Sequence, residues 1–211
     1  MPTPDASLPP DDPVDAGIAH LFAMVSEALA GATHALLGDE RDTARMVVER
    51  DQTIDDLAAS VERVVWDQVQ AAPRSALRRL VVVLLILPEL ERSADLAEHV
   101  AQRALTGLGR EMSPLSRGIV QRMTEVGLEM WETVASAYRD RSEQGVPLDE
   151  ADEELDILHH RLTHEVASGS MDPATAAQVT LLARFYERLG DHAVNLARRI
   201  GTLTSVGDEG D

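Results

Sequence analysis

A tandem repeat constrains the fold of this 211-residue chain more than any other feature of its sequence. The segments 91–95 and 187–191 both read E-R-x-x-D, and each lies late in an apolar run with helical spacing. Upstream of each segment stands a pair of aspartates four residues apart. These pairs are Asp51 with Asp55 and Asp152 with Asp156. The two halves are therefore expected to fold alike, with two carboxylate pairs each.

Apolar residues recur at helical spacing through most of the chain, and β-branched alternation is rare, so the predicted fold class is all-α. Glycine and proline between the apolar runs predict the helix ends. Three helices in each half give two tandem three-helix bundles. The six expected helices cover residues 15–37, 40–71, 75–106, 114–143, 148–168 and 173–204.

The same pattern divides the chain into four segments. Residues 16–109 form the first three-helix repeat and residues 110–204 form the second. Residues 1–15 are rich in proline and aspartate and lack the basic start and apolar stretch of a secretory signal, so they are expected to be a disordered arm. Residues 205–211 are expected to be a disordered acidic tail.

Composition narrows the class of protein. The chain has no cysteine, which fits a reducing compartment, and its strongest apolar run, residues 80–87, is far shorter than the roughly 20 residues of a membrane span. The net charge of −18 disfavours nucleic acid and anionic lipid as direct partners. A soluble cytoplasmic protein without direct membrane insertion is expected, with cations or basic protein surfaces as partners.

The acids of the first half are expected to face each other across a helical hairpin. Asp51 and Asp95 are equally distant in sequence from Pro73, which lies in the apparent turn. The same holds for Asp55 and Glu91. Because both helices rise by about 1.5 Å per residue, equidistant residues of an antiparallel pair lie opposite each other.

The second half repeats this register. Asp152 with Asp191, and Asp156 with Glu187, are both centred on the turn just before Pro173. On a helical wheel the later acids lie off the apolar stripe, so they are expected on the surface rather than in the core. Two acid pairs should thus face two acid pairs in each half.

Two interpretations of these acids remain open. An acid pair with this spacing is often only solvated surface charge, balanced by neighbouring arginines. The candidates are Arg50, Arg92, Arg184 and Arg188. Four carboxylates on adjacent helices instead raise one another's pKa or take up a cation. Oxygen-only ligands favour Mg²⁺, Mn²⁺, Fe²⁺/³⁺ or Ca²⁺, with Zn²⁺ less favoured, and the whole constellation favours this metal-binding interpretation.

Three further side chains are possible additional ligands. His99 follows Asp95 by four residues, and His160 follows Asp156 by four. A lone helical histidine is more often a packing or surface residue than a ligand. Asn195 takes the place of His99 in the later half and could orient a carboxylate or bind through its carbonyl oxygen.

Over residues 17–204 the chain resembles the PhoU family, whose two three-helix repeats carry E/D-x-x-x-D signatures that bind multinuclear metal clusters on the bundle surface. Here the signatures are Asp51-x-x-x-Asp55, Glu91-x-x-x-Asp95, Asp152-x-x-x-Asp156 and Glu187-x-x-x-Asp191. Residues 185–195 are the most specific part of the resemblance, and residues 179–200 look like the actinobacterial branch. The first repeat departs from the later one at Ser93-Ala94, which replaces Leu189-Gly190, and at His99, where the family often has asparagine.

The resemblance implies a function that the residues alone do not. It implies a metal-binding cytoplasmic regulator of phosphate uptake that restrains the phosphate-starvation response. Its partners would be the ATPase subunit of the phosphate ABC transporter and a phosphate-sensing histidine kinase, which would place it at the membrane periphery. The family also suggests a homodimer.

Two other functions are compatible with the sequence. One is a ferritin-like di-metal carboxylate oxidoreductase, which would need acids pointing into a bundle interior. The other is a metal-free helical adaptor. No phosphate-binding glycine loop or nucleophilic triad order is visible, so the chain is not expected to be an enzyme.

Overall fold

A computed structural model describes residues 12–140, 147–169 and 171–202 of the chain. Over these residues the structure contains helices and turns and no strand, which confirms the predicted all-α fold class. The helices are α1 (Pro13–Gly38), α2 (Arg41–Val69), α3 (Arg74–Thr106), α4 (Leu108–Glu111), α5 (Pro114–Asp140), α6 (Asp149–Ala167) and α7 (Pro173–Gly201). The six long helices are the six that the sequence predicts, with ends that differ by a few residues.

The start of α1 corrects the expected extent of the N-terminal arm. Asp12 caps this helix by accepting a hydrogen bond from the backbone N–H of Val14 at 2.9 Å, and Pro13 occupies the first helical turn, where its missing N–H costs nothing. Val14 is fully buried, so residues 12–15 belong to the folded body. The rest of the expected arm, residues 1–11, and the expected tail, residues 205–211, lie outside the described residues.

The short helix α4 was not predicted, and it spans the expected boundary between the repeats. Gly107 ends α3 in the left-handed conformation, with φ of 83°. Gly109 then lies so close to α1 that a Cβ at this position would stand 1.8 Å from the carbonyl oxygen of Leu36. The sequence predicts a helix end at Gly109. In the structure the position requires glycine for a different reason, the close packing against α1.

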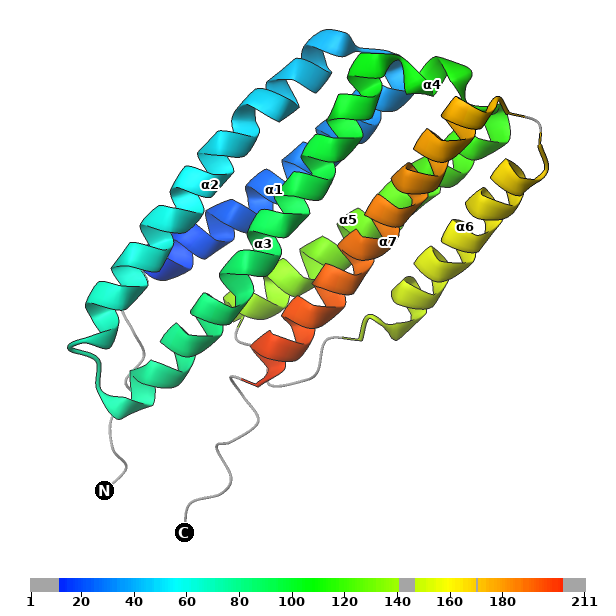
Figure 1. Ribbon diagram of the computed structural model, residues 1–211. Helices are drawn as coiled ribbons and strands as arrows, with labels where there is room; N and C mark the ends of the chain where they lie inside the picture. The colour runs from blue at the N-terminus through cyan, green and yellow to red at the C-terminus, as the bar shows by residue number, and fades with distance from the viewer. Residues whose placement is uncertain (1–11, 141–146, 170, 203–211) are drawn as a thin grey trace.

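The six long helices form two layers (Figure 1). The front layer contains α2, α3, α7 and α6 side by side in that order, and α1 and α5 lie behind it. Each half is a three-helix bundle, as predicted, and the two bundles lie against each other, because α3 packs on α7 and α1 packs on α5. Their buried apolar residues form one continuous core.

Polar contacts also join the halves inside this core. The hydroxyl oxygen of Tyr186 on α7 lies 2.5 Å from Oγ1 of Thr33 on α1, and Thr124 on α5 donates to Thr33 at 3.0 Å. All three side chains are buried, and the Tyr186 hydroxyl relies on Thr33 for a hydrogen-bond partner, whereas Thr33 and Thr124 also contact backbone oxygens of their own helices. The network links α1 of the first half to α5 and α7 of the second.

Helix α1 is long and apolar enough to pass as a membrane span by length and composition, with a mean hydropathy of 1.3 over its best window. The apolar run singled out in the sequence, residues 80–87, lies instead in α3. In the structure α1 packs against α2, α3 and α5, and residues such as Ile18 and Leu21 are fully buried. Its apolar character is that of a core helix.

Candidate functional site

The acids of the first half lie on facing surfaces of α2 and α3, as the hairpin register predicts. Asp51 and Asp55 come from α2, and Glu91 and Asp95 come from α3. The first three are half-buried and Asp95 is exposed, because Ile54 and Leu90, which flank them, turn into the core. The acids therefore form a surface cluster rather than a core site.

Electrostatic coupling shows that these carboxylates share one surface. Burial, followed by the charges of Glu98, Asp55 and Asp95, raises the pKa of Asp51 to about 6. Burial and the charge of Asp95 likewise raise the pKa of Asp55, and burial and the charge of Asp55 raise that of Glu91. Each shift has the sign expected when like charges are brought together at a partly desolvated site.

Three further acids, which the repeat pattern does not single out, border this cluster. Glu98 is the largest charge contribution to the raised pKa of Asp51. Glu62 and Asp56 raise the pKa of Glu91 and Asp55, respectively. The sequence could have identified Glu98, because it lies three residues after Asp95 and thus on the same helical face.

In the second half the structure brings together Asp152, Asp156 and Asp191. Burial comes first and the charges of Asp156 and Asp191 come next among the causes that raise the pKa of Asp152. A Cβ at Gly190 would lie 3.6 Å from Oδ1 of Asp152, which shows that Asp152 faces this part of α7. The predicted register of α6 against α7 thus holds at this end.

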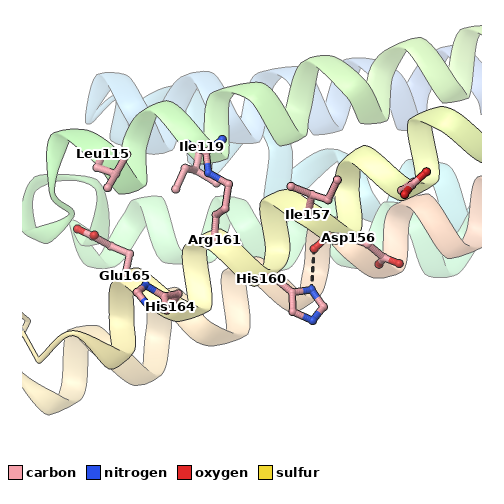
Figure 2. Close-up of a pocket in the computed structure, with 9 residues that line it drawn as sticks. Leu115, Ile119, Asp156, Ile157, His160, Arg161, His164 and Glu165 are labelled. Atoms are coloured by element: carbon pink, nitrogen blue, oxygen red, sulfur yellow. Dashed lines mark hydrogen bonds between the residues drawn. The ribbon is translucent and has the colours of Figure 1, made fainter.

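Glu187, the fourth predicted acid of the second half, contacts an arginine of its own helix. Its carboxylate forms an ion pair with Arg184, one turn earlier on α7. Asp156 also borders a different hollow, a groove of about 590 Å³ between α5 and α6 that Figure 2 shows. The charge of Asp55 raises the pKa of Glu91 in the first half, whereas Glu187 in the second half is paired with an arginine.

The three possible additional ligands have local partners. The ring of His99 stacks on Phe185 of α7, with centroids 5.3 Å apart. Nδ1 of His160 lies 2.8 Å from the backbone oxygen of Asp156 in its own helix. The Asn195 carbonyl oxygen accepts a hydrogen bond from Arg198 at 3.3 Å. His99 in particular serves the packing of α3 on α7.

The side chains as they stand are not arranged as a finished coordination sphere. Among residues 12–140, 147–169 and 171–202, no three acidic or histidine side chains converge closely enough to hold a metal ion. The donor set still suits a hard cation, because it is made of carboxylate oxygens whose mutual repulsion is visible in their pKa values. A cation would require rotation of side chains that already share a surface.

A second polar feature, which the sequence analysis did not identify, lies between α3 and α7. It is a groove of about 540 Å³. Four arginines line it, and so do His192, Glu89, Asp152, Asp191, Val194 and Asn195. The four are Arg92 of α3 and Arg184, Arg188 and Arg198 of α7. The groove therefore borders the second acid cluster through Asp152 and Asp191.

His192 forms the buried wall of this groove. Ser93 Oγ donates to the backbone oxygen of Glu89 at 2.6 Å and lies 2.8 Å from His192 Nδ1. Burial lowers the pKa of His192, Glu89 opposes the shift, and the charges of Arg188 and Arg92 lower the pKa further. Ser93, which replaces the leucine of the later repeat, thus supports a contact between the halves.

The four arginines that the sequence suggests as partners of the acid pairs mostly form other contacts. Arg184 does pair with Glu187. Arg50 instead lies 3.4 Å from Glu27, and Arg92 lies 3.8 Å from Glu89. Within the described part of the chain, the structure records no ion pair for Arg188. Most of the predicted cluster acids are thus not neutralised by these arginines.

Fold and site together define a helical-bundle protein with two carboxylate clusters on its surface. The PhoU domain family matches residues 18–104 and again residues 120–200. These two matches cover most of the chain, which therefore belongs to the PhoU family.

Relatives from several bacteria support this assignment. The chain is 28% identical to the "Phosphate-specific transport system accessory protein PhoU homolog" of Rhizobium meliloti, over 87% of this chain and 80% of that protein. It is 31% identical to the homologue of the same name from Caulobacter vibrioides, over 87% and 86%. A Mycobacterium tuberculosis relative, PhoU homolog 2, is 29% identical over 87% and 89%. These relatives are named as accessory proteins rather than enzymes.

Solved structures show the same fold. The crystal structure of the phosphate transport system regulatory protein PhoU from Streptococcus pneumoniae superposes with a TM-score of 0.83, at 18% identity, over 91% of this chain and 93% of that one. PhoU from Pseudomonas aeruginosa gives a TM-score of 0.81 at 22% identity, over 90% and 94%.

Proposed function

We propose that this protein is a metal-binding cytoplasmic regulator of phosphate uptake, which restrains the phosphate-starvation response by coupling the phosphate ABC transporter to a sensor histidine kinase. The observation that carries the proposal is the PhoU match in both halves, together with relatives named as accessory proteins of phosphate-specific transport. The absence of an enzyme name among these relatives fits a regulatory role.

The regulatory proposal is tested by deleting the gene and measuring phosphate-responsive transcription in phosphate-replete cells. We expect transcription that normally requires starvation to become constitutive. Purified protein should also bind the transporter ATPase subunit and the kinase cytoplasmic region of its own organism. Unchanged transcription, with binding to neither partner, would contradict the proposal.

The metal proposal assigns Asp51, Asp55, Glu91 and Asp95 to one cation cluster, with Glu98 at its border. It assigns Asp152, Asp156, Glu187 and Asp191 to the other. The support is the raised pKa of Asp51 and Asp152, because a bound cation would relieve the repulsion that raises them. The oxygen donors suit Mg²⁺, Mn²⁺ or Fe ions, and Zn²⁺ less well.

Elemental analysis of the purified protein tests the metal proposal. We expect bound metal in the wild type, less metal in Asp51→Asn/Glu91→Gln and in Asp152→Asn/Asp191→Asn, and no loss in the control Glu132→Gln, whose exposed acid on α5 lies outside both clusters. Equal metal content in all four proteins would refute it.

A ferritin-like oxidoreductase is less well supported than a regulator. That function needs acids directed into a bundle interior. Here Asp95, Asp156 and Asp191 are exposed. Oxygen consumption by the iron-loaded protein would favour this alternative. Unchanged thermal stability on adding chelator to protein as isolated would favour the metal-free adaptor.

The proposal includes a homodimer. Several large apolar side chains are exposed on the described surface, among them Trp66, Val81 and Leu85. Such residues are candidates for a subunit contact. Light scattering after size exclusion should give twice the chain mass of 22.9 kDa, and a monomer at micromolar concentration would contradict this part.

A further inference from the structure

The groove between α3 and α7 concentrates arginine on a strongly acidic protein. All 19 basic residues of the chain are arginine, and the net charge is −18. Four of these arginines nevertheless line this one groove. On α7 they recur at positions 184, 188 and 198, a spacing that places them along one face of the helix, and Arg92 faces them from α3.

Two of these arginines have guanidinium groups available for a ligand. Within the described residues, Arg188 has no recorded ion pair or hydrogen bond, and Arg198 contacts only the Asn195 side chain, at 3.3 Å. Arg92 is held loosely, with 3.8 Å to Glu89. The guanidinium fork donates paired hydrogen bonds that match the oxygen spacing of phosphate, which a lysine cannot do in the same way.

The negative charge in the groove is partly neutralised already. Glu89 is buried, and Arg199, from outside the groove lining, lies 3.1 Å from its carboxylate. Arg199 also donates to the backbone oxygen of Leu85, one turn before Glu89 in α3. The acids that remain in the lining are Asp152 and Asp191, against Arg92, Arg188 and Arg198, since Arg184 is paired with Glu187.

His192 lines the same groove with a largely buried side chain. Its side chain is only 7% exposed. Because the Ser93 hydroxyl proton is donated to the Glu89 carbonyl at 2.6 Å, the proton of the His192–Ser93 contact comes from Nδ1. In the neutral ring Nε2 is then an acceptor. It makes no hydrogen bond among the described residues, and its nearest recorded partner is the Glu89 carboxylate at 3.9 Å.

We propose that this groove binds a phosphate group, either inorganic phosphate or the phosphate of a small monoester. Arg92, Arg188 and Arg198 would donate to its oxygens, and Nε2 of His192 would accept from its P–OH group. A volume of about 540 Å³ suits a small organic phosphate as well as the free ion. The inference rests on the groove and does not depend on the proposed partners or on bound metal.

The test measures binding of inorganic phosphate and of AMP to the full-length protein by calorimetry, with chelator present so that no metal can hold the ligand. We expect saturable binding of at least one of the two, weakened about tenfold or more in Arg188→Ala/Arg198→Ala. The matched control Arg63→Ala/Arg78→Ala removes two exposed arginines outside the groove and should bind like the wild type.

Each outcome decides the matter. Binding of inorganic phosphate or of AMP alone identifies the source of the phosphate group. Binding of neither, or binding that survives in the groove variant, would overturn the proposal. Sulfate has no proton to donate at neutral pH, so it should bind about tenfold more weakly than phosphate. Equal affinity for the two ions would overturn the role of His192. If the groove binds no phosphate, the expected transcription phenotype of the deletion strain stays the same, so this proposal and the regulatory proposal can fail separately.

Discussion

At the scale of single residues, Asp51 illustrates how the acid clusters lower the stability of the metal-free protein. Burial and three neighbouring carboxylates raise its pKa from 3.8 to about 6. The folded protein thus binds more protons than the unfolded chain in this range. Stability is therefore expected to fall as pH rises from about 4 to about 6, and the full penalty is present above that.

Asp51→Asn should accordingly stabilise the metal-free protein at pH 7. After a discount for solvent screening of a half-exposed group, we expect a gain of about 1 kcal/mol in the free energy of unfolding. Urea unfolding in the presence of chelator, at pH 4.5 and pH 7, measures it. The gain should shrink at the lower pH, and a loss of stability at pH 7 would contradict the electrostatic interpretation.

Gly190 illustrates a residue whose role the sequence could only suggest. A Cβ here would stand 2.5 Å from Cδ1 of Leu155, which is buried between α6 and α7. Gly190→Ala is therefore expected to cost about 1–3 kcal/mol. The matched control is Gly118→Ala on α5, where a Cβ meets nothing within 4 Å and helix propensity should add up to about 1 kcal/mol. Thermal unfolding that shows no difference between the two variants would contradict the close packing.

At the scale of helices, an ionic network fixes the start of α1. Arg79 of α3 donates to Asp12 at 2.5 Å and to Asp15 at 2.8 Å, and its side chain is only 11% exposed. Tyr138 of α5 donates to the same Asp15 carboxylate at 2.8 Å. Three helices are thereby tied together at one end of the molecule.

Arg79→Ala should destabilise the protein by about 3–5 kcal/mol, because it removes the cation that pairs with the buried carboxylate of Asp12 and the part-buried carboxylate of Asp15. The neighbouring Arg78 is exposed and provides the control, since Arg78→Ala should change stability by less than about 0.5 kcal/mol. Chemical denaturation of both variants measures the difference. Similar effects in the two would show that the network contributes little.

Helix positions and register were largely predictable, because they follow from local periodicity and from the constant rise of a helix. The facing of Asp51 and Asp55 with Asp95 is an example. Contacts between the halves were not predictable, because they depend on tertiary packing. Ser93 and His99 looked like departures from the repeat, yet both contact α7, through His192 and Phe185. The arginine groove was missed for the same reason.

At the scale of the whole molecule, the continuous core predicts one cooperative unfolding transition despite the repeated sequence. Calorimetry on the full chain should give equal calorimetric and van't Hoff enthalpies. Two separate transitions would mean that the halves fold independently. That result would contradict the contribution of the buried Thr33, Tyr186 and Thr124 contacts to joining them.

The most direct test of the central claim is thermal unfolding with and without Mn²⁺, compared between the wild type and Asp51→Asn/Glu91→Gln. If the first cluster is a cation site, the variant should be the more stable protein in chelator, and Mn²⁺ should stabilise it less than it stabilises the wild type. At one hundred times its dissociation constant, the ion should add about 2.7 kcal/mol per intact site. Equal stabilisation of both proteins by Mn²⁺, or none of either, would contradict the claim.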